Sequence, residues 1–417
     1  MDKKKPLIYI LIASFGILAI LTIAVIVGNS GKKAKKPADS SISQVEPLSV
    51  KKEVKYTNSK SFLEDEKFLD EYQPNRKEEE KETRKQVKLL VSSVAKDIRV
   101  TLVDRTNRKI TGVPFYVSVK DVGEYKDLDM DGSVYIGGIP EGTYEVSLQN
   151  TEEYYCNEPI EIEVSETAKC NPLDDIMFLV VQERDINVEE EDAKQADVYR
   201  DETENTKITK SNEAVTFGID VSAWQRDIDW PKVKAAGVDF VIIRCGYRGA
   251  KTGALVEDSY FYKNLTGAKE AGIDVGVYFF TQAINETEAV EEASMVLALV
   301  GDTELEYPIF IDSENTNGRA DGLDRKTRTA VVSAFCQTIQ NAGRTAGIYA
   351  SRDWYNTHFE DSKLDSYVRW VAEYASTTAY KRRYKMWQYT SSGSVDGIVG
   401  RVDLDLSYIN DRENDDG

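Results

Sequence analysis

Apolar and polar residues alternate along the middle of the chain in the way that short strands do. Between residues 87 and 182, brief runs show a period of two, as expected for strands with one buried face. Turn pairs such as Asp131-Gly132 separate these runs, and this spacing favours a small all-β sandwich. The predicted strands are Ile98–Val103, Pro114–Val119, Ser133–Ile136, Tyr144–Leu148 and Ile160–Val164.

The pattern changes between residues 215 and 412, where apolar runs of strand length alternate with stretches of helix length. Such alternation predicts β/α units around a parallel sheet. About eight strands in roughly 200 residues fit a closed α/β barrel, with the last strands too close in sequence for full helices between them. The predicted strands are Phe217–Val221, Phe240–Arg244, Val275–Phe280, Tyr307–Asp312, Gly347–Tyr349, Val368–Val371, Tyr384–Gln388 and Val402–Asp405.

One apolar run near the start is long enough to span a membrane. Residues 7–28 carry no charge, and a spanning helix needs roughly 20 apolar residues, whereas a cleaved signal peptide has about 7–15. We therefore expect an uncleaved transmembrane helix after a short tail, residues 1–6. Lysines flank the run on both sides, so charge does not decide its orientation. Residues 29–86 are expected to be a charged spacer and residues 183–214 an acidic linker.

Composition excludes several classes of protein. The 417 residues have a formal net charge of −19, which disfavours nucleic-acid binding because phosphate contacts need clustered Lys and Arg. A single histidine excludes a His-rich zinc site. We expect no cofactor and no metal. Of the four cysteines, Cys156 and Cys170 lie close enough in sequence for a disulfide in an exported protein, although spacing alone does not establish the geometry.

One acidic loop resembles the start of a calcium-binding loop. Asp127, Asp129 and Asp131 precede Gly132 at alternate positions. In an EF-hand the twelfth position carries a bidentate glutamate, and here that position is Gly138. We therefore interpret the segment as a turn.

Four acids fall at the strand ends of the predicted barrel, where barrels of this kind place their active sites. They are Asp220, Asp312, Glu314 and Asp403. Asp312 and Glu314 stand at i and i+2, so in an extended strand their side chains point to the same side. A single Asp here would be explained as a helix cap, but four such acids favour catalysis. Clustered carboxylates raise one another's pKa, and a pair with one protonated member suits glycosidic bond cleavage.

Aromatic residues accompany these acids, and sugars present flat apolar faces that pack on aromatic rings. Each ring alone is explained as well by core packing, and together they favour a carbohydrate-binding groove. The residues expected to bind substrate are Tyr278, Phe280, Tyr349, Trp370, Glu373, Trp387 and Gln388.

At these positions the chain resembles glycoside hydrolase family 25, the Chalaropsis-type lysozymes. The matching motifs occur in the family's order, over roughly residues 217–410. They are Gly218-Ile-Asp-Val-Ser222 with Gln225 and Ile228-Asp-Trp230, Gly276-Val-Tyr-Phe-Phe280, Ile311-Asp-Ser-Glu314, Gly347-Ile-Tyr349, Trp370-Val-Ala372, Trp387-Gln-Tyr389, and Gly397-Ile with Val402-Asp403.

The resemblance implies an irregular (β/α)5(β)3 barrel that hydrolyses the β-1,4 bond between N-acetylmuramic acid and N-acetylglucosamine. It makes Glu314 the general acid/base, and Asp312 the residue that orients the substrate's 2-acetamido group. Asp220 and Asp403 would complete the carboxylate network. The nucleophile, either the acetamido group or an enzyme carboxylate, stays open. Phe279 stands where the family usually has a histidine.

A second, shorter resemblance concerns the middle of the chain. Asp131–Ile136 and Pro140–Val146 are similar to prealbumin-like and Cna-B-like surface modules, which implies a spacer or adhesive role.

Two other functions are compatible with parts of this pattern. A catalytically silent cell-wall-binding scaffold would grip glycan without cutting it, and the presence of all four acids argues against it. A chitinase-like enzyme also has an Asp-x-Glu at a strand end, but Tyr307 and Phe310 occupy positions where that family has aspartates.

The favoured reading is a membrane-anchored muramidase with its catalytic domain outside the cell. It would act on peptidoglycan in local wall remodelling, and a secretion or conjugation apparatus is a candidate partner.

Overall fold

The computed structural model describes residues 84–149, 151, 153–182 and 215–409. The chain divides into two units, Met1–Glu79 and Glu80–Gly417, and all described residues belong to the second. The transmembrane helix predicted for residues 7–28 lies outside the described residues, as do the spacer up to residue 83 and the linker 183–214. Within the described part of the chain, no helix is long and apolar enough to cross a membrane.

Residues 85–164 form two main antiparallel sheets. One has the order β2-β3-β6 and the other β5-β4-β7-β9, while β1 and β8 form a short parallel pair. The five strands predicted here are all present. The strands are β1 (Lys85–Gln86), β2 (Lys88–Ser92), β3 (Asp97–Val103), β4 (Tyr116–Val119), β5 (Gly123–Lys126), β6 (Ser133–Gly137), β7 (Gly142–Leu148), β8 (Tyr154–Tyr155) and β9 (Ile160–Val164).

A single apolar core joins the two main sheets. Ile98 and Leu102 from β3 are fully buried in the same cluster as Val117 from β4 and Val146 from β7. Inward residues alternate with exposed ones along β6 and β9, as the period of two predicts. These sheets therefore pack face to face as a sandwich. Cys156 and Cys170 do not form a disulfide in this structure.

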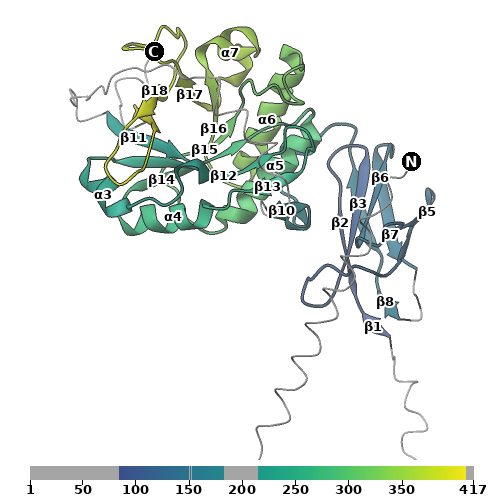
Figure 1. The fold of residues 1–417 in the computed structure, drawn as a ribbon. Helices are drawn as coiled ribbons and strands as arrows, with labels where there is room; N and C mark the ends of the chain where they lie inside the picture. Colours follow the sequence, from purple (N-terminus) through teal and green to yellow (C-terminus); the bar gives the residue numbers. More distant parts are fainter. Residues whose placement is uncertain (1–83, 150, 152, 183–214, 410–417) are drawn as a thin grey trace, which may run out of the picture. The chain divides into compact units, whose positions relative to one another are not determined.

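The second part of the described chain is a closed barrel (Figure 1). Eight strands close the ring in the order β11-β12-β14-β15-β16-β17-β18-β19, and β19 returns to β11. Neighbours run parallel except for β19, which is antiparallel to both β18 and β11. The strands are β11 (Thr216–Val221), β12 (Phe240–Arg248), β14 (Asp274–Phe280), β15 (Ile309–Asp312), β16 (Ala346–Ser351), β17 (Val368–Ala372), β18 (Met386–Gly393) and β19 (Val402–Ser407).

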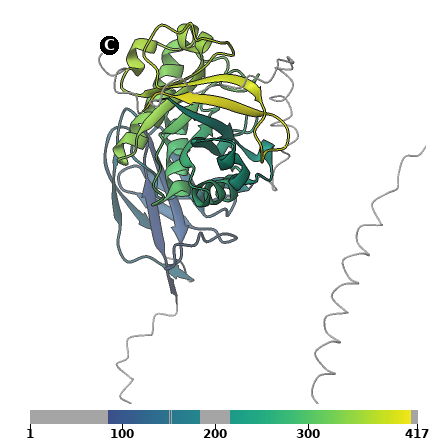
Figure 2. The ribbon, with the colours of Figure 1, turned by 90° about the vertical axis from the view of Figure 1, so that its left-hand side faces the viewer.

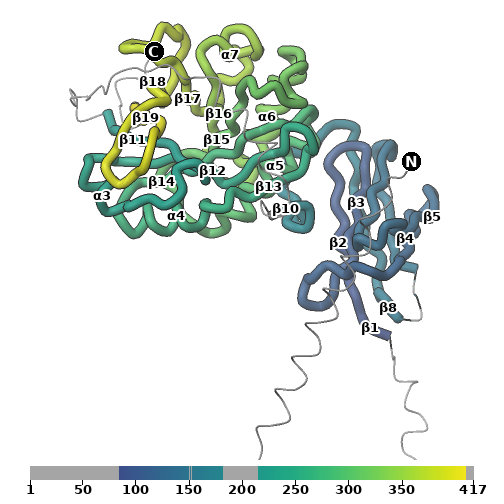
Figure 3. Tube along the Cα trace, viewed as in Figure 1, coloured from purple at the N-terminus to yellow at the C-terminus, as the bar shows by residue number. Residues whose placement is uncertain are grey.

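Helices connect the first strands and are absent between the last ones. One helix follows each of β11, β12, β14, β15 and β16, whereas β17, β18 and β19 follow one another without an α-helix, an order that can be traced in Figure 3. This order is the (β/α)5(β)3 arrangement expected from the sequence. The helices are α3 (Trp230–Ala235), α4 (Phe261–Glu270), α5 (Glu286–Val300), α6 (Arg325–Asn341) and α7 (Arg352–Thr357).

Side chains cap the longer helices. Asn285 accepts a hydrogen bond from the Glu288 amide at the start of α5, and Asp324 accepts one from the Thr327 amide at the start of α6. Such caps satisfy amides that have no partner within the helix. The large apolar cluster between the ring and its helices includes Val277 and Phe335.

A separate aromatic cluster fills the inside of the ring. Phe240, Phe310 and Trp370 are at most 1% exposed and lie in one group. Gly218 and Gly347 make room for two of these rings, because a Cβ there would lie 2.3 Å from the ring of Phe240 or Phe310. Two of the glycines in the sequence motifs are thus explained by packing in the barrel interior.

Two short strands extend the sheet beyond the ring. β13 (Leu255–Glu257) pairs antiparallel with the second half of β12, and β10 (Val180–Gln182) pairs parallel with β13. Neither was predicted. Figure 2, turned by 90° about the vertical axis from the view of Figure 1, shows the yellow C-terminal strands beside the teal first strand of the ring.

Candidate active site

The four predicted acids come together at one end of the barrel. Asp312 closes β15 and Glu314 follows it by two residues, while Asp220 lies near the end of β11. Asp403 lies near the start of β19 and pairs directly with Asp220. Because β19 runs against its neighbours, its beginning meets the carboxyl ends of the parallel strands, which is the end that carries catalytic residues in barrels.

Asp312 and Glu314 sit in surroundings that favour their protonated forms. Burial is the largest cause that raises the pKa of Asp312 well above its usual value, followed by the negative charges of Glu314 and Asp220. Burial also raises the pKa of Glu314 to about 7. Asp312 is 5% exposed, and its Oδ1 atom is buried without a hydrogen-bond partner among the described residues. Glu314 is only partly buried, so it is the more accessible of the two.

A second group of carboxyls lies around Asp220. Burial and then the charge of Asp405 raise the pKa of Asp220 well above its usual value, and burial followed by the charge of Asp220 does the same for Asp403. Asp405 is fully buried and accepts a 2.8 Å hydrogen bond from the Trp370 indole nitrogen. The sequence reasoning missed Asp405, although it stands two residues after Asp403 on the same strand face, the spacing that marked Asp312 and Glu314.

One amide connects this group to two tyrosines. Gln388 on β18 donates through Nε2 to Asp220 Oδ2 at 2.7 Å. Its Oε1 accepts from the hydroxyls of Tyr349 at 2.8 Å and Tyr374 at 3.0 Å. Gln388 is 2% exposed, and its bonds to Asp220 and Tyr349 are buried, whereas the bond to Tyr374 is partly buried. The amide thus fixes the orientation of the Asp220 carboxyl.

A buried cation faces the acids from β12. Arg244 forms an ion pair with Asp258, with 2.7 Å between Arg244 Nε and Asp258 Oδ2, and both side chains are at most 3% exposed. The Arg244 charge lowers the pKa of Asp312, against the larger effect of burial. The sequence reasoning missed this pair, because Asp258 lies outside the predicted strands and helices.

The arrangement provides a carboxyl with a raised pKa, Glu314, a second carboxyl beside it, Asp312, and the oriented carboxyl of Asp220. That set suits acid-assisted cleavage of a glycosidic bond. Comparison with known proteins agrees with this chemistry: residues 219–398 match the family described as glycosyl hydrolases family 25. We refer to this matched segment as the family 25 domain. The chain is a glycoside hydrolase.

Several proteins resemble the family 25 domain. The autolytic lysozyme of Clostridium acetobutylicum is 31% identical over 189 residues, which cover 45% of this chain and 54% of that protein. The uncharacterized protein YegX of Escherichia coli K12 is 28% identical over 198 residues, covering 45% of this chain and 68% of that protein. The solved autolysin LytC of Streptococcus pneumoniae is 33% identical, with a TM-score of 0.43 and 47% of each chain covered. The chain thus spans about half the length of the Clostridium and Streptococcus proteins.

The predicted substrate-binding residues of the family 25 domain occupy different places. Tyr278 and Tyr349 belong to the cluster inside the ring, and each lies edge-on to the Trp370 ring, at centroid distances of 6.4 and 4.6 Å. Trp370 itself is 1% exposed. The structure therefore places Trp370 as an interior residue that holds Asp405, with no free ring face for a sugar.

Trp387, Phe280 and Glu373 are also held by protein contacts. Trp387 packs in the outer apolar cluster and donates to the Glu373 carbonyl at 2.9 Å. Phe280 packs with Tyr247, again with little exposure. The Glu373 carboxylate binds Arg352 at 2.6 Å and accepts a hydrogen bond from the Thr378 hydroxyl. These contacts explain all three residues as supports of the strand ends.

Tyr374 is a better candidate for direct contact with substrate, and it was not predicted. It is 47% exposed while its hydroxyl reaches Gln388. Burial of the hydroxyl and the charges of Asp403 and Glu314 raise its pKa well above the usual value. A large, partly exposed aromatic residue next to Glu373 lacked any periodic signal, which is why pattern reasoning passed over it.

Phe279, which stands where the family usually has a histidine, points to the opposite face of the sheet from the acids. Phe279 is fully buried in the cluster between the ring and its helices, whereas its neighbour Tyr278 faces the barrel interior. Adjacent strand residues point to opposite faces. The phenylalanine therefore replaces the family's histidine in the packing layer.

Proposed function

We propose that the chain is a muramidase that cuts the β-1,4 bond between N-acetylmuramic acid and N-acetylglucosamine in peptidoglycan. The observation that carries the proposal is the partly exposed Glu314, whose pKa burial raises to about 7, beside the buried Asp312 in a family 25 domain. Two relatives named as lysozymes point the same way, the autolytic lysozyme of Clostridium acetobutylicum and lysozyme M1 of Streptomyces globisporus.

Glu314 acts as the general acid in this proposal. Its proton passes to the glycosidic oxygen as the bond from that oxygen to the sugar's anomeric carbon breaks, and the positive charge that develops on the ring is stabilised by nearby carboxyl groups. Asp312 orients the substrate's 2-acetamido group. Asp220 and Asp403 hold the network, with Gln388 fixing the Asp220 carboxyl. Water then completes hydrolysis, with Glu314 as the base that accepts its proton.

The location follows from the substrate, since peptidoglycan lies outside the cell membrane. We propose that residues 7–28 anchor the chain, that the short N-terminus is cytoplasmic, and that the barrel works on the wall side in local remodelling. Protease added to intact cells should then degrade the barrel. A barrel that survives until the cells are opened would contradict this orientation.

The activity is tested with the full chain on a suspension of purified peptidoglycan. Wild-type protein should clear the suspension and release fragments that end in reducing N-acetylmuramic acid. Glu314→Gln should lose at least about 100-fold in rate, as expected for a general acid. Glu270→Gln is the matched control, because Glu270 is exposed at the end of α4, and it should keep the wild-type rate.

Three outcomes would contradict the proposal. Fragments that end in reducing N-acetylglucosamine would mean that the enzyme cuts the other glycosidic bond. Binding to walls without release of reducing sugar would favour the silent scaffold. Equal rates for wild type and Glu314→Gln would remove Glu314 from the chemistry.

A further inference from the structure

The loop between β5 and β6 of the sandwich brings three aspartates together. Asp127, Asp129 and Asp131 each offer a carboxylate oxygen, and these oxygens lie within 4.8 Å of one another. Carboxylates at that distance repel one another unless a proton or a cation lies between them. The bunching therefore requires an explanation beyond the turn that the sequence predicted.

Asp127 supplies an independent sign that the cluster lacks a partner. It is 1% exposed, and its Oδ2 accepts a hydrogen bond from the Gly132 amide at 2.9 Å. Its Oδ1 is buried and has no hydrogen-bond partner among the described residues. A buried carboxylate oxygen without a partner is costly, and a bound cation would remove that cost.

The backbone of the loop holds this arrangement in place. Met130 has φ of 57° and Gly132 has φ of 86°. A Cβ at Gly132 would lie 2.2 Å from the Ile110 carbonyl oxygen, so glycine is required there. Asp131 Oδ1 accepts from the Ser133 amide at 2.8 Å. These backbone contacts fix the loop conformation, and none of them involves Asp127 Oδ1.

The local charge balance fits a divalent cation. The basic group paired with the cluster is Lys109, whose Nζ lies 3.3 Å from Asp131 Oδ2. This lysine offsets one of the three negative charges and leaves two. Oxygens bound to Ca²⁺ at about 2.3–2.6 Å can lie up to about 5 Å apart, so three oxygens within 4.8 Å of one another can share one Ca²⁺. Mg²⁺ binds at about 2.0–2.1 Å and demands nearly ideal octahedral geometry, so this loop suits Mg²⁺ less well than Ca²⁺.

We propose that Asp127, Asp129 and Asp131 form a calcium site in the sandwich. It is not an EF-hand, because Gly138 stands where that loop has its bidentate glutamate. Water molecules and backbone oxygens complete the coordination. With three carboxylates and a neighbouring lysine, the site binds weakly, with Kd on the order of 10⁻⁴–10⁻³ M.

The test is calorimetric titration of the full, chelator-treated chain with CaCl2, alongside thermal unfolding with and without the ion. Wild type should bind Ca²⁺ in the stated range. Asp129→Asn should weaken binding at least about 10-fold, and it should still fold because Asp129 is exposed. Asp121→Asn is the matched control: Asp121 is an exposed aspartate of the same module, with φ of 63°, which asparagine tolerates. It should bind as wild type does.

The proposal is overturned if wild type shows neither binding heat nor a shifted unfolding temperature up to about 10 mM Ca²⁺, tenfold above the weakest expected Kd. Equal affinity in wild type and Asp129→Asn would overturn it as well. Tighter binding of MgCl2 than of CaCl2 would overturn the assignment to calcium. None of these readouts depends on glycosidase activity.

Discussion

Glu314 and Asp312 stand two positions apart, yet solvent reaches them differently. Asp312 is almost completely buried, whereas Glu314 is partly exposed. Interacting acids release their protons in steps that belong to the group as a whole. A substrate can nevertheless take a proton only from the member that it reaches. Glu314 combines a raised pKa with access, which supports its proposed role as the proton donor.

The rate should fall as the pH rises past about 7, because Glu314 must be protonated to act and its pKa is raised to about 7. The raised pKa keeps the proton in place at pH 5–6, where an ordinary glutamate has lost it. Initial rates of reducing-end release between pH 4.5 and 9 test this. Glu292→Gln is the comparison, since the pKa of Glu292 is also raised to about 7 but Glu292 pairs with Arg248. That variant should keep the alkaline fall, and a rate that stays flat to pH 9 in wild type would refute the assignment.

Four of the clustered acids could be predicted because they lie at or near strand ends, whereas Asp405, at the end of a predicted strand, was missed. Asp220, Asp312, Glu314 and Asp403 each end or begin an apolar run, so the acids were found. The roles of the aromatic residues could not be found in this way, because a strand pattern does not tell which face points into the ring. Trp370 shows the limit: its ring is buried as support for Asp405.

At the scale of elements, the eight ring strands were all predicted, because each is a compact apolar run. The observed end of one strand differs from its predicted end. β12 continues to Arg248, four residues beyond its predicted end, through a register shift between Arg244 and Gly246. The extension pairs with β13, and a partner this short leaves no periodic signal in the sequence.

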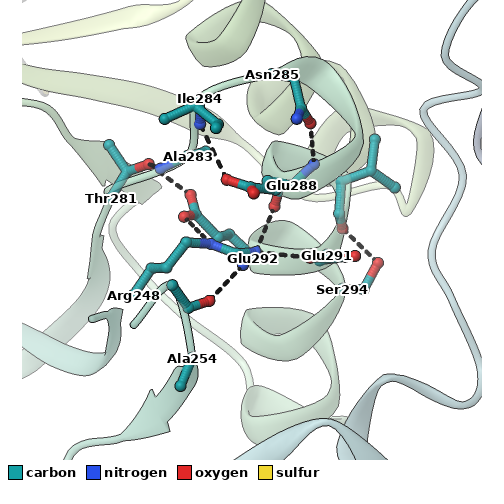
Figure 4. A network of polar contacts seen from close by, with 12 residues as sticks. Arg248, Ala254, Thr281, Ala283, Ile284, Asn285, Glu288, Glu291, Glu292 and Ser294 are labelled. Carbon is teal, nitrogen blue, oxygen red and sulfur yellow. Dashed lines mark hydrogen bonds and ion pairs between the residues drawn. The ribbon is translucent and has the colours of Figure 1, made fainter. Parts of the chain in front are cut away.

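Arg248 shows what the extended end of β12 does (Figure 4). Its Nε binds Glu292 and its Nη2 binds Glu291, each at 2.8 Å, so it ties β12 to α5. Glu292 also accepts a 2.6 Å bond from the Thr281 hydroxyl, just after β14. The Thr281 amide in turn donates to the Asp312 carbonyl at 3.0 Å. The network thus connects α5 to β15, the strand that ends in Asp312.

Replacing Arg248 with methionine should lower the free energy of unfolding by about 3–5 kcal/mol, because it leaves the buried Glu292 carboxylate without its cation. Arg248→Lys should recover little, since lysine cannot reproduce the forked contacts. Urea unfolding followed by tryptophan fluorescence measures the loss. The control is Lys234→Met on the exposed side of α3, expected within about 0.5 kcal/mol of wild type. A change in Arg248→Met no larger than in that control would show the network to be unimportant for stability.

At the scale of the whole molecule, negative charge accumulates both overall and inside the barrel. The formal net charge is −19, and burial raises the pKa of five clustered acids at the barrel end. They are Asp220, Asp312, Glu314, Asp403 and Asp405. A carboxyl with a folded-state pKa above its unfolded value holds more protons when folded, so it destabilises the fold as pH rises. The burial that raises the pKa of these acids therefore makes the folded barrel less stable at high pH.

The unfolding temperature of the full chain should consequently be higher near pH 5 than at pH 8. The stabilising contribution of the raised acids is complete below their unfolded pKa of about 4 and is lost as pH rises through their folded values. Acids with lowered pKa, such as Asp229 and Asp324 at helix caps, act in the opposite sense, but only below about pH 4, and solvent screens them because they are exposed. Scanning calorimetry between pH 4.5 and 8.5 measures the balance.

Asp405→Asn separates the buried acids from the overall charge. Asparagine keeps an oxygen for the Trp370 indole but cannot ionise, so the variant should unfold at a higher temperature than wild type at pH 8 and lose part of the pH dependence. One kcal/mol corresponds to about 2–4 °C in a domain of this size. Asp396→Asn removes the same charge from an exposed position. If both variants flatten the pH dependence equally, net charge and not the buried cluster sets the stability of the barrel.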